Sequence, residues 1–161
     1  MKESVIIEAC AGKLKGDAEK LVQRLLVRPV IMSQRILVVD DEAQIRELLA
    51  LYLSKQGYEV QTAASSAETM RLVNQAPLDL VVLDIGLAEE DGLGLLSTIK
   101  AQCPQLPVVM LTGMGFVEEL LQEANQKGAQ GYVSKVLPLE ELLLAIQRVL
   151  KPLGEHVLSG G

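Results

Sequence analysis

Five polar side chains at widely separated positions have the types that phosphoryl chemistry needs: Asp40, Asp41, Asp84, Thr112 and Lys135. Three carboxylates held close together repel one another, and a shared cation relieves that repulsion. Mg²⁺ fits this role, because it prefers oxygen ligands and commonly joins one or two carboxylates to a phosphoryl group. A lysine ammonium and a threonine hydroxyl can bind phosphoryl oxygens. One carboxylate must then act as the nucleophile, and we expect it to be Asp84, on the middle strand.

Five short apolar runs, each followed by a helical pattern, place these side chains. The predicted strands are 35–39, 59–63, 78–83, 107–111 and 131–133. The predicted helices are 43–56, 67–74, 93–102, 116–127 and 139–150. Near-continuous apolar runs are typical of strands that are buried on both faces. Strict alternation of strand and helix predicts a parallel sheet with right-handed crossovers.

This order of elements predicts a doubly wound α/β domain with helices on both faces of a five-stranded parallel sheet. In such a sheet, ligands bind outside the carboxyl ends of the strands. The polar side chains named above follow the first, third, fourth and fifth strands, so we expect them to meet at this edge. In the first helix of the domain we expect one buried stripe, made of Ile45, Leu48, Leu49 and Tyr52.

Length and composition limit the chain to one main domain. Its 161 residues are 49% apolar, which is enough to build one buried core. Residues 1–32 carry a net charge of +2 and the remainder carries −8. An acidic domain with 2% aromatic residues and no basic stripe argues against direct nucleic-acid binding. Cys10 and Cys103 lie far apart and His156 is the single histidine, which argues against a disulfide framework or a zinc site.

The two ends of the chain differ from the central domain. Residues 1–32 contain one amphipathic helical pattern and form an N-terminal extension, either a docking or dimerisation helix or an appendage before a start at Met32. Residues 152–161 form a short tail. No apolar run reaches the roughly 18 residues that a membrane-spanning helix needs, and we find no secretion signal. We therefore expect a cytoplasmic protein without membrane insertion.

Four segments together resemble the motif set of bacterial response-regulator receiver domains. They are VVDDE at 38–42, VVLDIGL at 81–87 with DG at 91–92, MLTG at 110–113, and GYVSK at 131–135. The resemblance spans about 33–151, and the whole set in this order is far more specific than any single motif. It implies a flavodoxin-like, three-layer αβα fold whose five strands have the order 2-1-3-4-5.

The resemblance also implies a signalling role rather than an enzyme with a separate substrate. Asp84 would accept a phosphoryl group from a sensor histidine kinase or a histidine phosphotransfer protein. The domain would catalyse only its own phosphotransfer and dephosphorylation. Mg²⁺ would be held by Asp40, Asp41, Asp84 and the backbone carbonyl of Gly86, with Asp41 and that carbonyl as direct ligands.

Three further assignments follow from the same resemblance. Thr112 and Lys135 would bind the phosphoryl group, and Tyr132 would be the switch aromatic whose ring moves inward when Thr112 is drawn toward the phosphate. The face formed by residues 116–151 would contact a downstream protein or a second copy of the chain. Two side chains of the last helix are candidate contacts on that face: Leu144 and Val149.

Two positions depart from the family pattern. Leu87-Ala88 stands where Met-Pro or Leu-Pro is common, and this difference is minor. Val136 follows Lys135, where the family usually has proline after a cis peptide bond. Because a cis bond before another residue costs about 2.5–4 kcal/mol, we expect a trans Lys135–Val136 bond and a less well placed ammonium. We expect phosphotransfer to survive at a lower rate.

Other classes of protein share part of this pattern. A haloacid-dehalogenase-like phosphatase also uses an aspartyl nucleophile with Mg²⁺, but it has a second aspartate where this chain has Gly86. Nucleotide enzymes need glycine-rich phosphate loops that are missing from the sequence. A flavin carrier would stack its ring on aromatic side chains, and the chain has three Tyr, one Phe and no Trp. An interaction module that kept the fold and lost phosphorylation stays open because of Val136, although the retained site residues argue against it.

Overall fold

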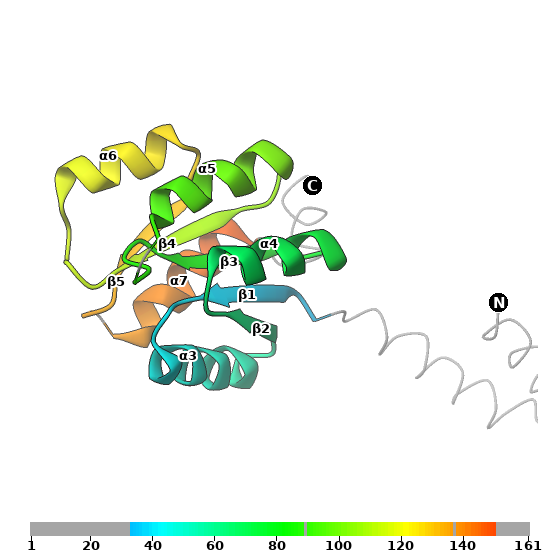
Figure 1. Ribbon diagram of the computed structural model, residues 1–161. Helices are drawn as coiled ribbons and strands as arrows, with labels where there is room; N and C mark the ends of the chain where they lie inside the picture. Colours follow the sequence, from blue (N-terminus) through cyan, green and yellow to red (C-terminus); the bar gives the residue numbers. More distant parts are fainter. Residues whose placement is uncertain (1–32, 89, 137, 151–161) are drawn as a thin grey trace, which may run out of the picture. The chain divides into compact units, whose positions relative to one another are not determined.

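The computed structural model describes residues 33–88, 90–136 and 138–150 (Figure 1). The predicted N-terminal extension and the predicted tail lie outside these residues. Five strands and five helices alternate along the described chain. The strands are β1 (Arg35–Val39), β2 (Glu59–Ala63), β3 (Leu80–Asp84), β4 (Val108–Thr112) and β5 (Gly131–Ser134). The helices are α3 (Ala43–Lys55), α4 (Ser66–Gln75), α5 (Gly92–Gln102), α6 (Glu118–Gln126) and α7 (Leu139–Val149).

The strands form one parallel sheet in the order β2-β1-β3-β4-β5, which confirms the predicted topology. All residues of β3 and β4 are buried, as the apolar runs predict for central strands. In the register of the sheet, Asp84 pairs with Leu111 and Thr112 pairs with Ser134. The carboxyl ends of β3, β4 and β5 are therefore level, and the chain leaves all three at one edge.

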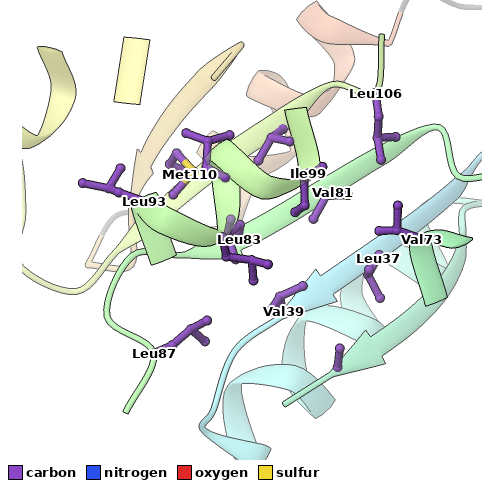
Figure 2. Close-up of a cluster of buried hydrophobic side chains, with 14 of the residues drawn as sticks. Leu37, Val39, Val73, Val81, Leu83, Leu87, Leu93, Ile99, Leu106 and Met110 are labelled. Carbon is purple, nitrogen blue, oxygen red and sulfur yellow. The ribbon is translucent and has the colours of Figure 1, made fainter. Parts of the chain in front are cut away.

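Side chains alternate between the two faces of the sheet and build two separate cores. Ile36 and Val38 face the α3–α7 core, where they pack with residues of α3 and α7. Leu37 and Val39 face the α4–α6 core, which contains residues of α4, α5 and α6 and is shown in Figure 2. The domain thus has the predicted three αβα layers (Figure 1). Each fully buried aliphatic side chain contributes about 1.5–3 kcal/mol to the stability of the fold. The two cores therefore hold the strands, and the polar side chains at the strand ends, in fixed positions.

Several local predictions are confirmed and others are wrong. Helix α3 ends as expected before Gly57, whose φ of +99° suits glycine better than other residues. The prediction that Leu48 belongs to the buried stripe is wrong, because its side chain is 48% exposed at the margin of that stripe. Leu144 is exposed as predicted, whereas Val149 packs against the α3–α7 core and is a poor candidate for a partner contact. Within the described residues, no helix has the length and apolar character to cross a membrane.

Candidate functional site

The turn between β1 and α3 holds Asp40 rigidly. Asp40 is fully buried, and its backbone N–H donates to the Ala63 carbonyl at 3.1 Å. Its carboxylate Oδ1 accepts from the Glu42 N–H at 2.9 Å, and its carbonyl oxygen accepts from Arg46 Nη1 at 2.7 Å. The neighbouring Asp41 is half-buried at the surface of the same turn. One carboxylate is therefore fixed beneath the edge, and the next one borders on solvent.

Asp84 lies at the centre of the site as the last residue of β3, not in the following loop. It is 3% exposed, and its Oδ1 accepts from the Gly86 N–H at 3.0 Å. The chain then returns so closely beneath Asp84 that a Cβ on Gly92 would lie 2.3 Å from the Asp84 carbonyl oxygen. Glycine at position 92 thus allows α5 to begin directly under the site. One carboxylate oxygen each from Asp40, Asp41 and Asp84 lies within 4.8 Å of the others, as the sequence predicts.

Lys135 reaches these carboxylates from the end of β5. Its Nζ lies 2.7 Å from Asp40 Oδ2, 3.1 Å from Asp84 Oδ2 and 3.3 Å from Glu42 Oε1, and its side chain is 14% exposed. The Lys135–Val136 bond is trans, as predicted. The lysine nevertheless lies directly against Asp84, so replacement of proline by valine leaves the ammonium at the centre of the site.

Burial and charge shift the pKa values of the two central groups. Burial raises the pKa of the Asp84 carboxyl, and the negative charge of Asp40 raises it further, against the opposing effects of the Gly86 N–H and Lys135. Burial alone would lower the pKa of Lys135. The Asp40 carboxylate, 2.7 Å from the ammonium, and the negative charge of Asp84 outweigh burial, so the pKa of the Lys135 ammonium lies above its ordinary value. Lys135 therefore stays positively charged. The three clustered carboxyl groups outnumber this one ammonium group.

Thr112 and Tyr132 lie on the neighbouring strands. Thr112 is 1% exposed at the last position of β4, and its Oγ1 accepts from the Met114 N–H at 3.1 Å. Tyr132 packs against the α4–α6 core, and its ring centroid lies 6.0 Å from that of Phe116. Its hydroxyl is buried, with no hydrogen-bond partner among the described residues. The threonine is thus at the site, and the tyrosine is on the next strand away from Asp84.

The donor set suits a hard divalent cation. Asp40, Asp41 and Asp84 supply oxygen atoms, which Mg²⁺ prefers, and one lysine cannot neutralise the group. Asp41 borders on solvent, which leaves room for the water ligands that Mg²⁺ usually keeps. The residues present therefore fit a magnesium ion. When bound, the ion would offset part of the negative charge of the carboxylates and of an incoming phosphoryl group.

Sequence reasoning missed two contacts of this site. The sequence pattern shows Glu42 only as part of a motif, yet its carboxylate contacts Lys135, 93 positions away. The pattern gives Arg46 no role, yet its side chain donates to the backbone carbonyl of Asp40. The spacing of four residues between Glu42 and Arg46 is the signal for this contact. It places the arginine in the first turn of α3, next to the segment 40–42.

Comparison with known proteins decides the family. The sequence model of the response regulator receiver domain family matches residues 36–147. The chain belongs to this family. The receiver domain is 37% identical over 120 residues to an NtrX-like response regulator of Rickettsia felis, an alignment that covers 73% of this chain and 25% of that protein. The chain thus spans about a quarter of the length of the curated relatives it matches.

Solved receiver structures agree with the fold. The receiver domain of NtrX from Brucella abortus is 42% identical, with a TM-score of 0.68, and the match covers 72% of this chain and 98% of that one. The chemotaxis protein CheY4 of Vibrio cholerae is 31% identical, with a TM-score of 0.70, and the match covers 74% of this chain and all of that one. A receiver that forms part of a longer regulator and a receiver that forms a whole chain are therefore both similar to this domain.

Proposed function

We propose that this receiver domain accepts a phosphoryl group on Asp84 in a two-component phosphorelay. The donor is a phosphohistidine of a sensor histidine kinase or of a histidine phosphotransfer protein. A phosphorus–oxygen bond forms to the Asp84 carboxylate while the phosphorus–nitrogen bond of the donor breaks, and the donor imidazole leaves. Water later hydrolyses the acyl phosphate, which returns the carboxylate and releases inorganic phosphate. The observation that carries the proposal is the Asp84 carboxylate at the sheet edge, 3.1 Å from Lys135.

The surrounding residues divide the work of binding. Asp40, Asp41, Asp84 and the backbone carbonyl of Gly86 hold Mg²⁺, which is supported by the cluster of three carboxylate oxygens. Lys135, which already lies against Asp84, moves its ammonium onto a phosphoryl oxygen. This set of residues catalyses the domain's own phosphorylation and dephosphorylation and acts on no separate substrate.

Thr112 and Tyr132 link the phosphoryl group to an output face. The Thr112 hydroxyl, whose oxygen accepts from the Met114 N–H, donates its hydrogen to a phosphoryl oxygen. Tyr132, the switch residue on the next strand, then moves its ring further inward, from a position in which its hydroxyl is already buried. The face of residues 116–151 meets a downstream protein or a second copy, and the exposed Leu144 offers an apolar contact there.

The domain organisation and the cellular setting are also part of the proposal. Residues 33–151 form the receiver domain, between an N-terminal extension at 1–32 and a tail at 152–161. The phosphorelay operates in the cytoplasm, where its kinase or phosphotransfer partner is found. The acidic character of the domain favours protein partners over nucleic acid.

Intact-protein mass spectrometry tests the phosphoacceptor directly. The full chain is incubated with a small acyl-phosphate donor, with and without Mg²⁺. We expect the wild-type protein to gain one phosphoryl group only when Mg²⁺ is present, and Asp84→Asn to gain none. Asp79→Asn is the matched control, because Asp79 is an exposed carboxylate near the start of β3, at the opposite edge of the sheet. If Asp84→Asn were phosphorylated to the same extent as the wild-type protein, the proposal would be contradicted.

The output face has its own test. Leu144→Glu places a charge on the exposed side of α7, and we expect it to weaken self-association or binding of the downstream protein after phosphorylation. Leu51→Glu is the control, because Leu51 is a similarly exposed leucine on α3. Analytical ultracentrifugation of the phosphorylated chain measures the first effect. Equal behaviour of both variants would rule out a specific role for the α7 surface.

A further inference from the structure

Arg46 contacts the β1–α3 turn at its backbone. Its Nη1 donates to the Asp40 carbonyl oxygen at 2.7 Å, and its own N–H donates to the Glu42 carbonyl oxygen at 3.1 Å. The side chain is half-buried. Hydrogen bonds from a charged donor are roughly twice as strong as neutral ones, so the longer-range contact is a firm one. One residue of α3 therefore ties down the segment that carries two of the three clustered carboxylates.

The choice of acceptor is unusual. Arginine most often pairs with carboxylates, because its planar fork matches their geometry. Asp40, Asp41 and Glu42 precede Arg46 in the same segment, yet none of the described carboxylates lies within 4.0 Å of its guanidinium. Lys135, by contrast, contacts three carboxylates. Arg46 thus braces the turn without occupying a carboxylate oxygen of the cluster.

The backbone of the turn has little other support from side chains. Glu42 stands at the N-cap position of α3, but its side chain makes no capping hydrogen bond. Asp40 uses its own carboxylate Oδ1 to hold the Glu42 N–H. Lys135 contacts the carboxylates of Asp40 and Glu42, whereas Arg46 donates to the backbone and fixes the peptide between Asp40 and Asp41. Arg46 therefore sets the backbone positions from which these two carboxylates extend.

We propose that Arg46 is a positioning residue for the cation site. By holding the Asp40 carbonyl, it keeps the carboxylates of Asp40 and Asp41 at the spacing that Mg²⁺ requires. This inference rests on the proposed function, since it assigns a role toward the ion of that site. Partners of this kind, one shell outside the ligands, typically change metal affinity about 10- to 100-fold when they are removed.

Charge and positioning predict opposite signs, which makes the proposal testable. If Arg46 acted only as a positive charge beside the acidic cluster, its removal would tighten Mg²⁺ binding. If Arg46 positions the turn, its removal weakens binding despite the more negative site. Arg46→Met removes both charge and donor, whereas Arg46→Lys keeps the charge on a flexible stem without the rigid fork.

Isothermal titration calorimetry of the full chain with Mg²⁺ provides the measurement. We expect about 10-fold weaker binding for Arg46→Met and a smaller loss for Arg46→Lys. Arg71→Met is the matched control, because Arg71 is an exposed helical arginine that contacts only Gln75 among the described residues, and it should bind as wild type does. Phosphoryl uptake gives a second readout. Arg46→Met should need more Mg²⁺ for half-maximal uptake, yet approach the wild-type rate at saturating Mg²⁺.

Each outcome decides the matter. Tighter or unchanged binding by Arg46→Met, with wild-type binding intact, would overturn the role of Arg46 and leave the proposed function standing. A wild-type chain that binds no Mg²⁺ would overturn both proposals. If circular dichroism shows that Arg46→Met does not fold, Arg46→Lys decides in its place, and wild-type affinity there would overturn the positioning role.

Discussion

The β1–α3 turn and the β4–α6 loop lie at the same edge of the sheet, but they are built differently. In the turn, residues 40–42 are held by hydrogen bonds from Arg46 and to Ala63, and by one between Asp40 and Glu42. The loop, residues 113–117, carries two glycines and two large exposed side chains, Met114 at 72% and Phe116 at 64% exposure. Its backbone is tied to the site through the Thr112 hydroxyl. The β1–α3 turn, which is held by several hydrogen bonds, suits cation binding. The β4–α6 loop has fewer bonds and suits a change of conformation after phosphorylation.

This contrast extends to the backbone beneath Asp84, where substitutions should cost more than in the β4–α6 loop. Gly92→Ala should have the largest effect, a loss of about 3 kcal/mol of unfolding free energy, because the new methyl group overlaps the Asp84 carbonyl oxygen. Gly113→Ala is the control in the other region, where the nearest atom to the new methyl group is Lys135 Cδ at 3.8 Å. Urea unfolding measures both. Equal losses would remove the contrast.

Lys135→Ala should have the next largest effect in Mg²⁺-free buffer. We expect a loss of about 2 kcal/mol of unfolding free energy, because the buried carboxylates of Asp40 and Asp84 lose their positive partner. Added Mg²⁺ should restore part of this loss. Lys55→Ala, an exposed lysine at the end of α3, should change stability by less than about 0.5 kcal/mol. Urea unfolding with and without Mg²⁺ measures both variants. If the loss of unfolding free energy in Lys135→Ala does not change when Mg²⁺ is added, this explanation is wrong.

Asp84→Asn should stabilise the Mg²⁺-free protein at neutral pH, by less than Lys135→Ala destabilises it, because burial and the charge of Asp40 raise the pKa of the carboxyl that it removes. The pKa of the Asp84 carboxyl is higher in the folded state than in the unfolded state. Folding therefore takes up a proton, and wild-type stability falls as pH rises from the unfolded pKa through the folded one. The advantage of Asp84→Asn should appear above that window and vanish below it. Thermal unfolding from pH 3 to pH 8 checks the sign.

Phe116→Ala should have the smallest effect. The ring is largely exposed and its contact with Tyr132 is long, so we expect a loss of at most about 0.5 kcal/mol. The rate of phosphoryl uptake should be unchanged, because Phe116 is a largely exposed residue of the β4–α6 loop and is not one of the clustered carboxylates. Urea unfolding and intact-mass kinetics test both statements. A large fall in uptake would show that the two regions are not separable.

The sequence predicts the framework of the domain better than the contacts within its site. Apolar runs identify β1, β3 and β4 because both faces of these strands are buried, and their ends then locate Asp40, Asp84 and Thr112. The order of the strands needed the family resemblance. Whether Leu48 is buried depends on how α7 packs beside α3. The periodicity of one helix carries no information about that packing.

Contacts between distant segments were beyond prediction for the same reason. Lys135 was expected at the site, but its three carboxylate partners follow from side-chain reach across the sheet edge. The bond from Arg46 to a backbone carbonyl leaves no pattern in residue types. The assigned roles of all the site residues stay predictions until the variants and the Mg²⁺ titrations are measured. These residues are Asp40, Asp41, Asp84, Gly86, Thr112, Tyr132 and Lys135.

The buried Tyr132 hydroxyl sets a thermodynamic bias. A buried polar group without a partner destabilises its conformation by about 1–3 kcal/mol, and a conformation that turns the hydroxyl toward water recovers this free energy. This free energy opposes the inward position of the ring, so a phosphoryl group that draws the ring inward must bind the inward state more tightly by at least the same amount.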